Sequence, residues 1–175
     1  PLAPTLSIAE NAQVLAEYIE AVRSHTGAER IDLVGHSLGG LISRYYIQNL
    51  MPESTAEGLP AVPAINQFII AGTPNGGTAC GRPGAALRFF SPATSQITPE
   101  YVTQVFNPVV RDRRGVPFFA IAGDSVKQTA IRCSALPSDS LVSVDSVLNG
   151  IAVMADRIEA RHADLNNGRP AFERM

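Results

Sequence analysis

The sequence predicts an α/β fold in which a mostly parallel sheet is flanked by helices. Three apolar segments of strand length, residues 31–34, 65–71 and 116–122, are separated by much longer connections. Connections of that length suit parallel strands, because antiparallel neighbours need only a short turn. Helix-period patterns precede and follow the first strand, as alternating α/β architecture requires. No internal repeat or low-complexity tract interrupts this alternation.

Length and composition are those of one globular domain. The chain has 175 residues, 45% of them hydrophobic and 17% charged, and its formal net charge is −2. That charge balance gives no electrostatic reason to expect nucleic acid or an anionic membrane surface as a partner. The longest apolar runs, residues 68–72 and 116–123, are too short to cross a bilayer. Because the chain starts at Pro1 without a signal-peptide pattern, we expect a processed or partial chain.

The first element is expected to be an amphipathic helix packed on the sheet. Ser7 is placed as its N-cap, and Glu10 follows at the spacing of a capping box. Apolar residues recur at intervals of three and four as far as Val22, and Gly27 is positioned to end the helix. His25 lies near that end and is interpreted as a solvated residue.

A strand-to-helix turn carries the strongest chemical signal. The strand Ile31–Val34 leads into Gly35-His36-Ser37-Leu38-Gly39, a G-x-S-x-G pattern, and a helix follows to about Leu50. A serine at such a turn needs a strained backbone, and its glycines let the strand and helix pass closely. The turn would hold the Ser37 hydroxyl out of the sheet, beside the positive end of the new helix.

The middle of the chain is predicted to supply a second strand and an insertion. Residues 65–71 form the strand, and Gly72–Thr78 form a wide loop at its carboxyl end, where ligands bind in open α/β sheets. Residues 81–115, rich in proline and aromatic side chains, are predicted to be a lid or cap. An ordinary helical crossover is the alternative for the first half. Within the insertion, Thr98-Pro99-Glu100 is a good helix start.

The last third of the chain holds the remaining candidates. A third strand over 116–122 is followed by a loop, by the polar segment Ser138–Val142, by an apolar element at 151–158 and by His162. A serine hydroxyl becomes nucleophilic only when a base takes its proton and an acid orients that base. Of the three histidines, His25 precedes the strand and His36 is expected to point away from Ser37, which leaves His162 as the base.

The residues alone leave the acid open. Asp112 is flanked by three arginines and is interpreted as part of a solvated charge cluster. Asp124 directly follows a strand, which makes it a serious rival to Asp139 in its polar loop. The acidic candidates between Ser37 and His162 are Asp112, Asp124, Asp139, Asp145 and Asp156.

Four segments together resemble the bacterial triacylglycerol lipases and esterases of the α/β-hydrolase superfamily. They are D-L-V-G-H-S-L-G-G, A-G-T-P-N-G-G-T, P-S-D-S-L-V and R-H-A-D-L, in that family's order. The resemblance implies that Ser37 is the nucleophile, Asp139 the acid and His162 the base. It implies one α/β-hydrolase domain over residues 1–175, forming the C-terminal part of that fold, with the cap insertion at about 81–115.

The sequence departs from this family in two places. Asn75 stands where many relatives have histidine. The family's H-G motif, which supplies one oxyanion donor from an earlier strand, would lie before residue 1, so we expect a missing N-terminal segment or chain. The backbone N–H of Leu38 is left as the expected oxyanion donor. A lost donor of this kind costs on the order of 100-fold in rate.

The resemblance implies a serine ester hydrolase, either a lipase or a carboxylesterase, acting on a lipid or small ester through an acyl-enzyme. An acyltransferase or phospholipase with the same triad, and a non-catalytic binding protein of this fold, are the alternatives. No cofactor is expected, and a structural calcium is neither supported nor excluded. The insertion is expected to line the acyl pocket, with the aromatic residues Phe89, Phe90, Tyr101 and Phe106.

The two cysteines, Cys80 and Cys133, could form a disulfide, which would indicate an enzyme that acts outside the cell. Cys80 follows the T-P-N-G-G loop and Cys133 precedes the acid loop, and both loops are expected at the same edge of the sheet. A disulfide between them would pin the base of the cap to the acid loop in a secreted enzyme. Two buried thiols are the alternative that the sequence leaves open.

Overall fold

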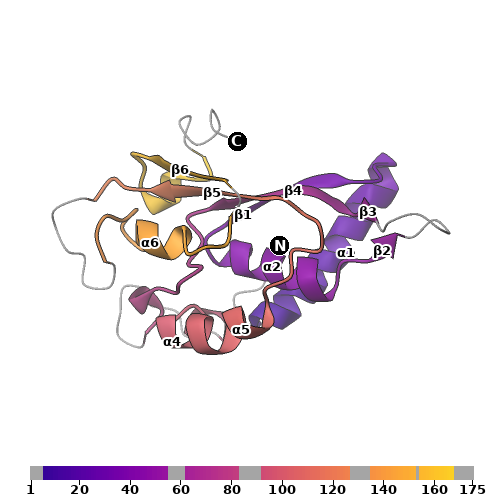
Figure 1. Ribbon diagram of the computed structural model, residues 1–175. Helices are drawn as coiled ribbons and strands as arrows, with labels where there is room; N and C mark the ends of the chain where they lie inside the picture. The colour runs from indigo at the N-terminus through magenta and orange to yellow at the C-terminus, as the bar shows by residue number, and fades with distance from the viewer. Residues whose placement is uncertain (1–5, 55–61, 83–91, 127–134, 153, 168–175) are drawn as a thin grey trace.

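A parallel sheet organises the chain, as the sequence predicts (Figure 1). The computed structural model describes residues 6–54, 62–82, 92–126, 135–152 and 154–167. Its main sheet has the strand order β1-β4-β5-β6, and all three pairings are parallel. The four strands are β1 (Ile31–His36), β4 (Ile65–Ala71), β5 (Phe118–Gly123) and β6 (Met154–Ile158).

The register of these strands brings their carboxyl ends to one edge. His36 lies beside Ala71, Ala71 beside Ile121, and Gly123 beside Ile158. The residues that follow each strand therefore gather at this edge, where open α/β sheets bind ligands. A separate antiparallel pair, β2 (Glu53–Ser54) with β3 (Val62–Pro63), lies outside the main sheet.

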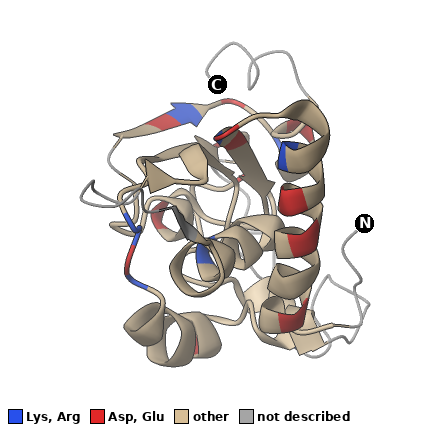
Figure 2. Ribbon diagram, turned by 90° about the vertical axis from the view of Figure 1, so that its right-hand side faces the viewer, with Lys and Arg blue, Asp and Glu red and all other residues tan. Residues whose placement is uncertain are grey.

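Helix α1 (Ile8–Thr26) has the termini that its sequence predicts. Ser7 is the N-cap of a complete capping box with Glu10, and these hydrogen bonds lower the pKa of the Glu10 carboxyl. Gly27 ends the helix with φ 71°, a left-handed conformation that suits glycine. Figure 2 shows acidic residues along the outer side of this long helix. No helix in the described ranges is both long and apolar enough to cross a membrane.

Helix α2 (Leu38–Asn49) starts directly after Ser37 and passes very close to the sheet. A Cβ added to Gly35 would lie 2.8 Å from the Gly40 Cα, and one added to Gly40 would lie 1.9 Å from the Thr73 Oγ1. Neither position has room for a side chain. The two glycines therefore let the strand, the helix and the loop after β4 meet at one point.

The described part of the predicted cap is a set of short helices that belongs to the core. It contains α3 (Pro92–Ser95), α4 (Pro99–Tyr101), the π-helical turn η2 (Val102–Phe106) and α5 (Asn107–Val109), after the 3₁₀ turn η1 (Ala79–Gly81). Thr98 is the N-cap of α4, as predicted. Residues 97–110 bury four apolar side chains in the main core, so this described stretch packs as a crossover between β4 and β5. The four are Ile97, Val102, Phe106 and Val110.

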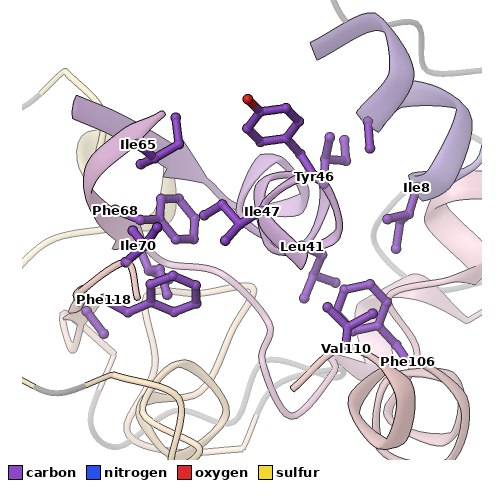
Figure 3. Close-up of a cluster of buried hydrophobic side chains, with 14 of the residues drawn as sticks. Ile8, Leu41, Tyr46, Ile47, Ile65, Phe68, Ile70, Phe106, Val110 and Phe118 are labelled. Atoms are coloured by element: carbon purple, nitrogen blue, oxygen red, sulfur yellow. The ribbon is translucent and has the colours of Figure 1, made fainter. Parts of the chain in front are cut away.

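The hydrophobic core lies between the sheet and one layer of helices (Figure 3). Phe68 of β4 and Phe118 of β5 meet edge to face, with ring centroids 5.0 Å apart. Ile47 of α2 packs toward Phe68, whereas Leu41 of α2 packs toward Phe106 and Val110 (Figure 3). Further core residues come from α1, from the crossover and from α6 (Val144–Val147). Buried aliphatic and aromatic area of this kind is the main stabilising contribution to the fold.

The opposite face of the sheet is less covered. It carries a smaller cluster around Ile69, Ile121 and Leu165, close to the 3₁₀ turn η3 (His162–Asp164). Among the residues that the structure describes, the longer helices all lie on the other side, as Figure 1 shows. Val34 is 49% exposed on this face, and a groove of about 350 Å³ lies over β4, β5 and β6.

Two neighbouring glycines of α2 provide a test of the close approach. Gly40→Ala should lower the free energy of unfolding by about 1–3 kcal/mol, because the added methyl group meets Thr73 in a packed interior. Gly39→Ala is the matched control: nothing lies within 4 Å of its added Cβ. It should stay within about 1 kcal/mol of the wild type, since alanine favours helices. Denaturant unfolding of both variants measures the difference, and equal stabilities would contradict the steric argument.

Candidate active site

Ser37 occupies the strained turn that the G-x-S-x-G pattern predicts. Its backbone has φ 54° and ψ −130°, outside the regions that non-glycine residues usually adopt. Such strain costs on the order of 1–3 kcal/mol and persists only where the surroundings enforce it. Here the Ser37 N–H donates to the Ala71 carbonyl at 2.9 Å, and the Ser37 carbonyl accepts from the Gly40 N–H at 3.0 Å. The residue is partly exposed at the sheet edge.

Leu38 is the first residue of α2, directly after Ser37. Its N–H belongs to the first helical turn, whose amides have no acceptor within the helix. Those amides and the helix dipole make this end of α2 suited to negative charge.

Asp139 and His162 form a buried pair at the same edge. Asp139 is fully buried, and its Oδ2 accepts a hydrogen bond from His162 Nδ1 at 2.7 Å. Its Oδ1 accepts the backbone N–H groups of Leu141 (3.0 Å) and Val142 (2.8 Å), so both carboxylate oxygens have donors. The His162 N–H also donates to the Asp139 carbonyl at 2.7 Å. The imidazole is therefore oriented by one residue through two hydrogen bonds.

Two glycines make room for this pair. A Cβ on Gly72, which has φ 58°, would meet the Leu165 side chain at 2.6 Å and Asp139 Oδ2 at 3.0 Å. A Cβ on Gly123 would meet the Ala160 carbonyl at 2.5 Å and the Asp139 Cβ at 2.7 Å. The carboxyl ends of β4 and β5 thus approach the pair with bare backbone, which lets Asp139 lie between them.

The other candidate acids lie elsewhere. Asp124 forms an ion pair with Arg157, with 3.5 Å between its Oδ2 and the arginine Nη2. Asp112 and Asp145 are exposed, and the Asp156 side chain accepts from the Arg157 N–H. Among the five candidates, Asp139 is the carboxylate that contacts His162. This hydrogen bond favours Asp139 among the acids that the residues alone left open.

His36 makes no hydrogen bond to the Ser37 hydroxyl among the described residues, but it contacts His162. Its Nε2 lies 2.8 Å from the His162 carbonyl oxygen and donates a hydrogen bond to it. The two imidazole rings are 4.6 Å apart between centroids and tilted by 43°. The residue before the serine therefore contacts the residue expected to be the base. Its position inside the glycine–serine motif was the available signal.

Arg44 forms a buried polar centre that sequence reasoning missed. The residue is only 3% exposed, and its guanidinium donates to Asn75 Oδ1 (3.1 Å), Asn107 Oδ1 (2.9 Å) and the Val110 carbonyl (3.0 Å). It also lies 4.9 Å from the centroid of the Phe106 ring. Burial lowers its pKa to about 10. No motif or spacing in the sequence singles Arg44 out as buried.

These bonds fix the loop after β4. Asn75 Nδ2 donates to the Val147 carbonyl at 2.8 Å, and Asn107 Nδ2 donates to the Asn75 carbonyl at 2.8 Å. Farther along, the Thr78 hydroxyl donates to the Leu141 carbonyl at 2.6 Å, two residues from Asp139. The T-P-N-G-G loop is thus tied to the helices below and to the acid loop beside it.

The expected acyl-pocket residues fall into two groups. Phe89 and Phe90 lie outside the described residues. Tyr101 is half-buried, and its hydroxyl accepts from Gln96 Nε2 at 3.1 Å, whereas Phe106 is buried in the core. The acyl pocket therefore stays a prediction. So does the disulfide, because Cys133 also lies outside the described residues.

A chain with this parallel sheet and a serine turn at its carboxyl edge folds as an α/β hydrolase. The sequence pattern of the family described as lipase (class 2) matches residues 5–97, more than half of the chain. The chain belongs to that family, and its resemblance to bacterial lipases and esterases is confirmed.

Several solved structures share the fold. The mature form of the Bacillus licheniformis lipase BlEst2 has a TM-score of 0.75 at 16% identity, covering 98% of this chain and 75% of its own. The propeptide form of the same lipase has a TM-score of 0.73 at 18% identity, covering 98% of this chain and 41% of its own. The product of gene lin2722 from Listeria innocua has a TM-score of 0.59 at 23% identity, covering 97% of this chain and 65% of its own. The chain thus spans less than two thirds of the last two.

Replacing the buried acid tests its relation to His162. Asp139→Asn keeps the side-chain volume. Its amide oxygen can still accept from the Leu141 and Val142 N–H groups, but its NH₂ group then faces His162 Nδ1, which loses its acceptor. We expect kcat/KM on a short-chain p-nitrophenyl ester to fall by about 10³–10⁴-fold. Asp124→Asn, which removes the ion pair with Arg157, should stay within a few-fold of the wild type. Comparable losses in both variants would contradict the assignment of Asp139.

Proposed function

We propose that the protein is a serine ester hydrolase that cleaves a lipid or small ester through a covalent acyl-enzyme. The observation that carries the proposal is the Asp139–His162 hydrogen bond, formed at the same sheet edge as the strained Ser37 turn. A buried carboxylate bonded to an imidazole, at the same sheet edge as a partly exposed serine, is an arrangement suited to acyl transfer. Membership in a lipase family agrees with it.

In the proposed first step, the Ser37 Oγ attacks the ester carbonyl carbon while its proton passes to His162 Nε2. A C–O bond forms, and the electron pair of the carbonyl moves onto oxygen. The N–H of Leu38, at the start of α2, donates to that oxyanion. Asp139 holds the His162 Nδ1–H and stabilises the imidazolium by its negative charge.

In the second step the tetrahedral intermediate collapses and the bond to the alkoxy group breaks. His162 gives its proton to the leaving alcohol, and Ser37 remains acylated. Water then repeats the sequence: His162 accepts a proton from water, the hydroxide adds to the acyl carbon, and the proton returns to Ser37 as the acid leaves. The nucleophile, the base and the acid of these steps are side chains of this chain, and the proposed reaction uses no cofactor.

Covalent labelling of the serine is the direct test. The intact mass after incubation with a fluorophosphonate should increase by one adduct, and Ser37→Ala should remain unlabelled. Ser43→Ala is a control, because the Ser43 hydroxyl is already bonded to the Gly39 carbonyl at 2.8 Å inside α2. That variant should label like the wild type. A folded wild-type chain that takes no adduct would refute the proposal and favour a non-catalytic binding protein of this fold.

We further propose that Cys80 and Cys133 form a disulfide and that the enzyme acts outside the cell. Cys80 follows the loop that is bonded to the acid loop through Thr78 and Leu141, so a bridge here would reinforce an existing contact. Titration of native protein with a thiol reagent should find no reactive thiol even in denaturant, and two after reduction. Two thiols in denaturant before reduction would exclude the bridge.

A further inference from the structure

The proposed reaction does not use the contact between His36 and His162, although this contact involves the residue proposed as the base. The proton that moves in that reaction passes between Ser37 and His162. His36 touches neither the serine hydroxyl nor the Asp139 carboxylate by any hydrogen bond within the described residues. It contacts His162 in two ways. Its Nε2 lies 2.8 Å from the His162 carbonyl oxygen, and the two ring centroids are 4.6 Å apart.

The main chain of His162 is held on both sides: its N–H donates to the Asp139 carbonyl at 2.7 Å, and its carbonyl accepts two hydrogen bonds. The residue begins the short turn η3, which follows β6 after a few irregular residues. Its carbonyl accepts from the Leu165 N–H at 3.4 Å, a long hydrogen bond, and from His36 Nε2 at 2.8 Å. The shorter of the two comes from β1, the strand that also leads into Ser37. His36 therefore links the expected base to the strand that carries the expected nucleophile.

The charge state of His36 suits this position. Burial, and next the positive charge of His162, lower the pKa of His36, and the hydrogen bond to the His162 carbonyl and the charge of Asp139 oppose them only partly. His36 is thus biased toward the neutral form. A neutral neighbour does not repel the imidazolium that His162 becomes during the proposed reaction, whereas a second cation at this distance would.

We propose that His36 is a positioning residue, which holds the backbone and ring of His162 in one arrangement relative to Ser37. The inference rests on the proposed function. The proton on His36 Nε2 stays in place throughout, because its acceptor is a backbone carbonyl. A displacement of about 1 Å between reacting groups can cost on the order of 100-fold in rate, which sets the scale of the effect.

Two substitutions separate the hydrogen bond from the packing. His36→Phe keeps a ring against His162 and removes the donor, whereas His36→Gln keeps an N–H at a similar reach and removes the ring. We expect His36→Phe to lower kcat by about 10–100-fold with KM within twofold, and His36→Gln to recover most of that loss. His25→Phe, at the exposed end of α1, should match the wild type. Phosphonate adducts should still reach one per chain in every variant, but form more slowly in His36→Phe.

A second measurement works without turnover. The proton shared by His162 Nδ1 and Asp139 should give a slowly exchanging downfield NMR signal in the wild type. In His36→Phe that signal should broaden through faster exchange, and in His36→Gln it should persist. Wild-type kcat and an unchanged signal in His36→Phe would overturn the inference. So would equal losses in both variants with equally lowered melting temperatures, which would indicate packing alone. An unreactive wild type would refute the proposed function, and the NMR comparison would still decide the role of His36.

Discussion

The structure depends on one close approach, that of helix α2 to strand β1 and to the loop after β4. Gly35 and Gly40 have no room for a side chain, and Thr73 fills the space beside them. Because of this contact the chain must turn sharply between β1 and α2, and Ser37 adopts a strained backbone conformation with φ 54°. The cost of order 1–3 kcal/mol is offset by burial around it. The exposed serine is thus a consequence of how tightly the sheet and the helix pack.

Each remaining group at the edge is placed by a different strand. Gly72 follows β4 and Gly123 ends β5, and both leave space for the Asp139 side chain, while His162 comes after β6. Parallel strands bring these ends together automatically, but they do not fix side chains to the accuracy that proton transfer needs. Hydrogen bonds do that. Asp139 accepts two from backbone amides and one from the His162 ring, and His36 donates one to the His162 carbonyl.

Features that depend on local sequence could be predicted. The capping box at Ser7, the αL glycine at position 27 and the turn at Ser37 each involve residues within a few positions, so their patterns are visible in the chain. The choice of Asp139 over Asp124 needed tertiary contacts, because Asp124 directly follows a strand and Asp139 lies in a polar loop, and an acid is plausible at both places. The contact of His36 and the burial of Arg44 could not be predicted for the same reason. Histidine and arginine are polar residues, which the sequence alone would place at the surface. Only the fold shows that His36 contacts His162 and that Arg44 is buried.

Arg44 has a consequence for how such a sequence can change over generations. Its guanidinium is matched by Asn75, by Asn107 and by a backbone carbonyl, with the Phe106 ring against it. Loss of the arginine alone would strand buried amide oxygens without donors, whereas replacing the whole set by apolar residues of similar volume could be nearly neutral. We therefore expect these positions to change together: homologues that lack the arginine at position 44 should also carry substitutions at positions 75 and 107.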